Sequence, residues 1–209
     1  MAIVCPTVTA RTIDEYQEQM ERITPFAKRI HIDLADGEFT HVKLVPLGDV
    51  WWPKELEADI HVMYKRPFKL TKKLISLHPR MVVVHAEAEG DFVSFAHKLH
   101  KRRIKVGVAL KPETPVSVIQ PSLEVIDHVL IFSGNLGHFG GQANTHLLTK
   151  ALLLKKLKPS LEIGWDGGIN NQNIRVLEAG GVSVLNVGGF IQHAADAQAA
   201  YRTLEDLVG

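Results

Sequence analysis

The sequence predicts an α/β protein made of a single (β/α)8 barrel domain, a TIM barrel, spanning residues 1–209. Eight short apolar runs begin near residues 3, 29, 58, 81, 105, 128, 161 and 182, about 26 residues apart, and each leads into helical or loop sequence. No Ser-rich, Pro-rich or charged linker divides the chain. An open doubly wound sheet is the competing fold. That fold requires a glycine-rich turn after the first strand, and residues 6–10 contain no glycine.

The first half of the chain alternates between strand and helix patterns. The β-branched run Ile3–Val8 precedes a segment, Thr12–Ile23, in which apolar residues recur at helical spacing. After the strand that begins near residue 58, Pro67 marks the start of a helix that extends to Leu77. Met81–His85 is a continuous apolar strand of the kind that is buried on both faces. Asp91 then provides an N-cap for a helix running to residue 100.

The second half continues the alternation with one irregular step. A short proline-bounded segment, Val116–Leu123, stands where a helix is due, and further helices are expected at 145–157, 172–179 and 196–207. Gly180 and Gly181 suit a left-handed cap at the end of the helix before the last strand. In the final helix we expect the apolar face to consist of Ala199, Ala200, Leu204 and Leu207.

Composition limits the classes of function. Lys and Arg total 24 against 23 Asp and Glu, with no basic tract, so we expect neither nucleic acid nor an anionic membrane surface as a partner. No apolar run approaches the roughly 20 residues that span a bilayer. Cys5 is the single cysteine, and residues 1–6 are too short and uncharged for a secretory signal. We therefore expect a cytoplasmic protein with a small-molecule ligand.

Polar side chains interrupt three of the apolar runs near their carboxyl ends. His31 and Asp33 are two residues apart in a strand and so point to the same face; His61 lies in the next strand and Asp166 closes the seventh. The carboxyl ends of the strands meet at one mouth of a (β/α)8 barrel. Two imidazoles and two carboxylates suit one divalent metal per subunit, such as Zn(II), Fe(II), Mn(II) or Co(II). The alternative interpretation of His31 and Asp33 is a polar pair whose partners lie elsewhere in the fold.

Glycine clusters follow the last three strands. They occur at 137–141, 167–168 and 188–189. Glycine lets backbone N–H groups approach an anion closely, and the loops after the seventh and eighth strands commonly bind phosphate in these barrels. Each pair alone could be a simple turn, but three clusters beside adjacent strands predict a phosphate site.

Other aromatic and histidine residues carry weaker signals. His97 and His100, one turn apart, indicate a solvated helix face, whereas His85 ends a strand and is expected to support the site or the core. Trp51 and Trp52 form either an apolar surface patch for self-association or a cover for the barrel floor.

Six motifs occur in a shared order along the chain. They are His31 to Phe39 (His-Ile-Asp-Leu-Ala-Asp-Gly-Glu-Phe), Asp59 to Met63, Val84 to Glu87, Gly107 to Thr114, Phe139 to Gln142 and Asp166 to Ile169. With these motifs the chain resembles the ribulose-phosphate 3-epimerase family over nearly its whole length.

The resemblance implies a barrel of the ribulose-phosphate-binding type and an isomerase that interconverts D-ribulose 5-phosphate and D-xylulose 5-phosphate through an enediolate. It implies metal ligands at His31, Asp33, His61 and Asp166, with Asp33 and Asp166 as the acid and base pair. It also implies a homo-oligomer. The substrate-binding residues it implies are Thr7, His61, Met63, Gly137, Phe139, Gly140, Gly141, Gln142, Gly167, Gly168, Gly188 and Gly189.

Several positions depart from the family pattern. Ala35 and Phe132 stand where the family has methionine, Thr7 and Gly189 where it has serine, Leu136 where it has proline, and His138 is an added residue. The metal and acid–base set is intact, so these departures bear on substrate and rate more than on reaction type.

Two alternatives to this epimerase remain from the sequence, and a third is disfavoured. Because alanine leaves more room than methionine, Ala35 makes a longer ketose phosphate such as D-allulose 6-phosphate an alternative substrate. A barrel that binds a sugar phosphate or a protein partner without turnover is the second alternative. A related decarboxylase group has Asp-x-Lys-x-x-Asp on this strand, and Ala35 in the lysine position argues against it.

Overall fold

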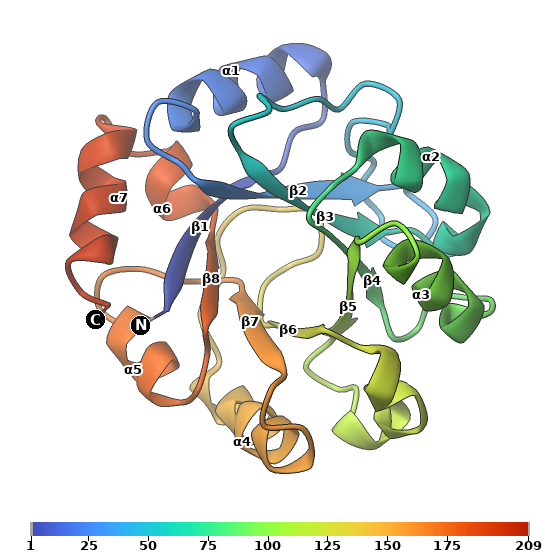
Figure 1. Cartoon of the computed structure of the whole chain (residues 1–209). Helices are drawn as coiled ribbons and strands as arrows, with labels where there is room; N and C mark the ends of the chain where they lie inside the picture. The colour runs from blue at the N-terminus through green and yellow to red at the C-terminus, as the bar shows by residue number, and fades with distance from the viewer. Residues whose placement is uncertain (1, 209) are drawn as a thin grey trace.

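A computed structural model describes residues 2–208, which form a closed barrel of parallel strands ringed by helices (Figure 1). Neighbours in the barrel follow chain order, and β8 closes the barrel by pairing with β1. The strands are β1 Ile3–Val8, β2 Arg29–Ala35, β3 Glu57–Met63, β4 Met81–His85, β5 Lys105–Leu110, β6 His128–Phe132, β7 Glu162–Asp166 and β8 Val184–Val187. The predicted fold class is confirmed; Met1 and Gly209, the ends of the predicted domain, lie outside the described residues.

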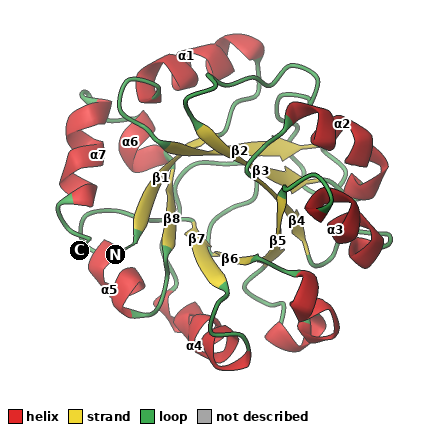
Figure 2. Cartoon of the chain, viewed as in Figure 1, coloured by secondary structure: helices red, strands yellow, loops and turns green. Residues whose placement is uncertain are grey.

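The helices form the outer ring around the strands (Figure 2). The α-helices are α1 Ile13–Ile23, α2 Thr71–Leu77, α3 Phe92–His100, α4 Leu148–Leu157, α5 Ile174–Ala179, α6 Gly189–Gln192 and α7 Ala197–Glu205. Short 3-10 helices are η1 Pro67–Leu70, η2 Val116–Val118, η3 Gln120–Val125 and η4 Thr145–Leu147. The pair η2 and η3 takes the place of a helix between β5 and β6, as the proline-bounded segment predicts.

Local sequence sets the ends of these helices. The side chains of Thr12, Asp91 and Asp196 each accept a hydrogen bond from a backbone N–H in the first turn of α1, α3 and α7. Such caps each contribute about 1 kcal/mol to helix stability. After α5, Gly181 has a φ of +93°, so this glycine supplies the left-handed conformation expected there.

Strand alternation sorts the side chains of β2 between two environments. Ile30, Ile32 and Leu34 join the main apolar core between the strands and the helices. His31 and Asp33, on the opposite face, are also buried but point into the barrel. The period of two in the sequence therefore separates packing residues from site residues.

Charged residues close the floor of the barrel. Arg29 is 4% exposed and lies 2.6 Å from Asp59 and 2.9 Å from Glu162. Arg80 reaches the same two carboxylates, and His128 Nδ1 lies 2.8 Å from Glu162. Each buried charge thus has a partner of opposite sign, which burial in a barrel interior requires.

The structure confirms the predicted apolar face of the last helix in part, because Leu204 is buried and Leu207 packs against the core. Ala197, Tyr201 and Leu204 are the buried residues of α7, whereas Ala199 is exposed. Positions 197, 201 and 204 follow the helical spacing of four and three residues, and Tyr201 contributes far more apolar surface than an alanine does.

The space expected beside Ala35 is filled. Ala35 is 1% exposed and packs with Leu44 and Met63, because the segment between β2 and β3 folds back and Leu44 N–H donates to the Ala35 carbonyl. Trp51, in the same segment, is 47% exposed, its ring contacts Tyr16 of α1 edge to face, and Trp52 packs partly against the core. The homo-oligomer stays a prediction.

Candidate metal centre and active site

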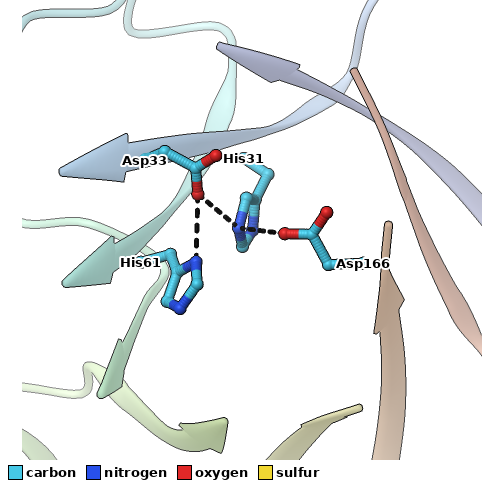
Figure 3. A group of neighbouring side chains, drawn as sticks. All are labelled: His31, Asp33, His61 and Asp166. Carbon is cyan, nitrogen blue, oxygen red and sulfur yellow. Dashed lines mark hydrogen bonds and ion pairs between the residues drawn. The ribbon is translucent and has the colours of Figure 1, made fainter. Parts of the chain in front are cut away.

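The four side chains predicted to bind metal lie together inside the carboxyl end of the barrel (Figure 3). His31 and Asp33 come from β2, His61 from β3 and Asp166 from β7. One ligand atom from each lies within 4.8 Å of those of the others. Asp33 and Asp166 lie on either side of the His31 ring.

The spacing of these atoms suits a single ion. His61 Nδ1 lies 3.0 Å and His31 Nε2 3.3 Å from Asp33 Oδ1, and His31 Nε2 lies 3.6 Å from Asp166 Oδ2. Ligands about 2.1 Å from one ion lie about 3.0 to 3.4 Å from each other in octahedral or tetrahedral geometry. His31 Nε2 and Asp166 Oδ2 are buried without a hydrogen-bond partner, a cost of roughly 1–3 kcal/mol per group that a cation would remove. The residues present therefore fit a divalent cation.

The same surroundings hold the two carboxyl groups in different protonation states. Burial alone would raise the pKa of Asp33, but its contacts with the imidazoles of His31 and His61 outweigh burial and hold that pKa below the ordinary value. Burial and the nearby charge of Asp33 raise the pKa of Asp166. A pair of carboxyls with pKa values moved apart in this way is suited to act as one base and one acid.

Thr9 forms a hydrogen bond with Oδ2 of Asp33 and was not predicted from the sequence. Thr9 Oγ1 donates to Asp33 Oδ2 at 2.7 Å. The side-chain amide of Gln19 exchanges two hydrogen bonds with the backbone of Thr9, at 2.9 and 3.1 Å. The alternation of Thr7 and Thr9 at the end of the first apolar run, which matches that of His31 and Asp33, was the available signal.

A cavity of about 260 Å³ opens above the cluster and is the right size for a small ligand. Asp33 and Asp166 lie in its wall. Of the predicted substrate-binding residues, it is lined by Thr7, Phe139, Gly140, Gly141, Gly167, Gly168, Gly188 and Gly189. The others lie elsewhere: His61 and Met63 are buried and do not line the cavity, Gly137 lines an adjoining hollow, and Gln142 is exposed.

The glycines after β7 and β8 allow three loops to pack closely. A Cβ added at Gly167 would lie 2.2 Å from the backbone nitrogen of Gly134, and one at Gly188 would lie 2.4 Å from the ring of Phe139. Gly167 also has a φ of +109°, which side chains rarely adopt. The loop after β6 therefore lies directly against the two loops predicted to bind phosphate.

Asn186 is a second cavity residue that was not predicted from the sequence. It lies in β8, in register with Asp166 of β7, and is 3% exposed. Its Oδ1 has no hydrogen-bond partner, and the residue lines the cavity. An asparagine inside an apolar strand was the signal, since a buried amide is costly unless it is hydrogen-bonded.

The remaining histidines differ in their surroundings. His85 is buried and its Nε2 lies 3.0 Å from His61 Nε2, in agreement with its predicted supporting place. His97 is exposed as predicted, whereas His100 is half-buried and contacts Asp127 at 2.7 Å.

Fold and site together define a (β/α)8-barrel protein with a buried centre of two histidines and two aspartates beneath a small polar cavity. The model of the ribulose-phosphate 3 epimerase family matches residues 3–192. The chain belongs to this family.

Named relatives and solved structures agree with that assignment. A ribulose-phosphate 3-epimerase of Helicobacter pylori (strain J99) is 28% identical over 98% of this chain and 97% of that protein. One from Bacillus subtilis is 31% identical over 82% of each. The crystal structure of 3-hexulose-6-phosphate synthase from Salmonella typhimurium has a TM-score of 0.72 and 16% identity over 100% of this chain and 98% of that one, which shows a shared fold.

Within residues 2–208, no helix combines the length and the apolar character needed to cross a membrane.

Proposed function

We propose that the protein is a metal-dependent ribulose-phosphate 3-epimerase that interconverts D-ribulose 5-phosphate and D-xylulose 5-phosphate. The observation that carries this proposal is the placement of Asp33 and Asp166 on either side of His31, below a cavity of small-ligand size. Family membership and the names of its relatives support the choice of substrate.

Epimerisation at C3 needs a proton removed from one face of the sugar and one returned to the other. With the sugar lying between the two carboxyls, ionised Asp33 takes the C3 proton and leaves an enediolate, and protonated Asp166 delivers a proton to the opposite face. In the reverse direction the two residues exchange roles. The placement of the two carboxyls on either side of the His31 ring supports this division.

The cluster would hold the metal through His31, Asp33, His61 and Asp166. A bound divalent ion supplies Lewis-acid stabilisation of the negative charge that develops on the enediolate oxygens. Zn(II), Fe(II), Mn(II) and Co(II) all suit this mixture of nitrogen and oxygen ligands.

The remaining cavity residues bind the sugar phosphate. Backbone N–H groups of the loops at Gly167–Gly168 and Gly188–Gly189 receive the phosphate. Thr7 Oγ1 and Asn186 Oδ1, both buried without protein partners, face the sugar hydroxyls. These contacts orient C3 between the two carboxyls.

One observation favours a longer ketose phosphate as a second candidate substrate. A hollow of about 450 Å³ adjoins the cavity and shares Phe132, Gly134 and His138 with it. This hollow, and not the filled space beside Ala35, supplies room for an additional carbon of D-allulose 6-phosphate. Comparing kcat/KM for the two substrates decides between them.

Metal analysis combined with exchange of the C3 hydrogen tests the proposal. The purified protein should contain one divalent ion per chain, and in heavy water the product should carry deuterium at C3. Binding of ribulose 5-phosphate without deuterium incorporation or turnover would instead support a non-catalytic barrel.

A further inference from the structure

A line of polar contacts extends from His61, starting at the ring nitrogen that does not contact Asp33. His61 Nε2 lies 3.0 Å from His85 Nε2, and His85 Nδ1 lies 3.6 Å from Glu87 Oε2. The other oxygen of Glu87 accepts a hydrogen bond from the hydroxyl of Thr114. The line therefore runs from β3 through the end of β4 to the loop after β5.

The chemistry of imidazole permits one consistent placement of the protons along this line. His61 Nδ1 faces the metal centre, 3.0 Å from Asp33 Oδ1, and must be unprotonated to bind a cation. Its Nε2 then carries the proton and donates to His85 Nε2. His85 in turn carries its proton on Nδ1, directed toward the carboxylate of Glu87.

The opposite tautomer of His61 is disfavoured by Glu87. If His61 carried its proton on Nδ1, its Nε2 would accept from His85 Nε2–H. The lone pair of His85 Nδ1 would then face the lone pairs of the Glu87 carboxylate, which is repulsive. Asp33 Oδ1, 3.0 Å away, favours a proton on His61 Nδ1 when no cation is bound, and the negative charge at Glu87 opposes this by favouring the tautomer in which His61 can bind a cation.

The surroundings hold His85 and Glu87 in place. The His85 side chain is fully buried, and its ring lies 4.8 Å from that of Phe39 and 6.1 Å from that of Phe132, centroid to centroid. Lys150 Nζ stabilises the loop that carries Thr114 by donating to the backbone carbonyls of Lys111, Pro112 and Thr114. Burial opposes ionisation of Glu87, yet the nearby imidazole of His85 and the hydrogen bond from Thr114 lower its pKa to about 2.

We propose that His85 and Glu87 are positioning residues that keep His61 Nδ1 unprotonated and directed at the metal, and thereby set the affinity of the site for its ion. The inference deepens the proposed function and rests on it. Residues that orient metal-binding histidines in this way typically contribute a factor of 10 to 100 to metal affinity.

Zinc affinity of two variants tests the proposal. Glu87→Gln removes the charge and keeps the shape, and His85→Leu removes the acceptor for His61. The dissociation constant of Zn²⁺ for the purified full-length protein is measured by competition with a chelating dye at one neutral pH. We expect it to rise about 10-fold for Glu87→Gln and by up to about 100-fold for His85→Leu.

Two exposed residues provide matched controls. Glu113→Gln removes a carboxylate from the loop after β5, and His97→Gln removes an imidazole from α3; neither should change zinc affinity. Long-range proton–nitrogen spectra of the zinc-loaded protein should show the His61 proton on Nε2 in the wild type. A proton on Nδ1 there would overturn the proposal.

The outcomes separate this inference from the proposed function. If both variants lower the thermal midpoint of the metal-free protein but bind zinc as the wild type does, His85 and Glu87 are structural only and the inference is wrong. If the wild type is an active epimerase that binds no zinc or other divalent ion, the inference and the proposed metal role both fail.

Discussion

Replacing Asp166 with asparagine separates its role as an acid from its role as a ligand. Asparagine has nearly the same shape and keeps an oxygen for the ion, but it cannot donate or accept the transferred proton. Among the described residues that line the cavity, Asp33 and Asp166 are the only carboxylic acids, so no neighbour can take over. A positioned acid or base contributes roughly 10² to 10⁴ in rate, so kcat should fall by that factor, or about 2.7 to 5.5 kcal/mol in activation free energy.

The assay follows both conversion and exchange. Turnover of D-ribulose 5-phosphate is measured together with metal content and with deuterium entry at C3 in heavy water. Asp33 remains in the variant, so exchange should persist for the epimer whose C3–H faces Asp33 while conversion is nearly lost. Glu124→Gln neutralises an exposed carboxylate that lines neither the cavity nor the adjoining hollow, and this control should behave as the wild type. A kcat for Asp166→Asn close to that of the wild type, with metal retained, would refute the two-carboxyl mechanism.

Three further predictions concern the cavity and the floor. Gly188→Ala places a methyl group against the Phe139 ring, and the overpacking costs about 1–3 kcal/mol. We expect steady-state kinetics to show a KM raised about tenfold. An unchanged KM would contradict close packing of these loops. Asn186→Leu should lower kcat/KM about tenfold without lowering the melting temperature, because its Oδ1 has no protein partner to lose; loss of stability instead would indicate a structural role. The third prediction concerns Glu162 at the floor of the barrel. Burial alone would raise the pKa of this carboxyl, but its contacts with His128 and Arg29 outweigh burial and hold the pKa below its ordinary value of 4.5. A carboxyl whose pKa is lowered by folding stabilises the fold above pH 4.5, and this stabilisation is lost as the pH falls below that value. Glu162→Gln should therefore make the free energy of unfolding depend less on pH in the acid range. An unchanged pH dependence in denaturant titrations would contradict this.

The sequence predicted more of the centre than of the cavity wall. His31, Asp33, His61 and Asp166 could be found because each interrupts an apolar strand, and the rule that strand ends meet at one mouth places them together. Asn186 interrupts a strand in the same way, but no histidine or carboxylate lies within two residues of it to indicate a site. Met63 was predicted by resemblance alone, and Gly137 and Gln142 also belong to the glycine-rich segment after the sixth strand; their positions outside the cavity depend on how the neighbouring loops fold.

By itself the sequence determined the alternation of strands and helices, the helix caps, and the faces to which neighbouring strand residues point. These features depend on residues a few positions apart, whose geometry the backbone sets directly. The tertiary structure alone decided which side chain fills the space beside Ala35, which face of α7 is buried, and that His85 meets His61. Such contacts join segments far apart in the chain, so they follow from barrel closure and side-chain packing and not from local spacing.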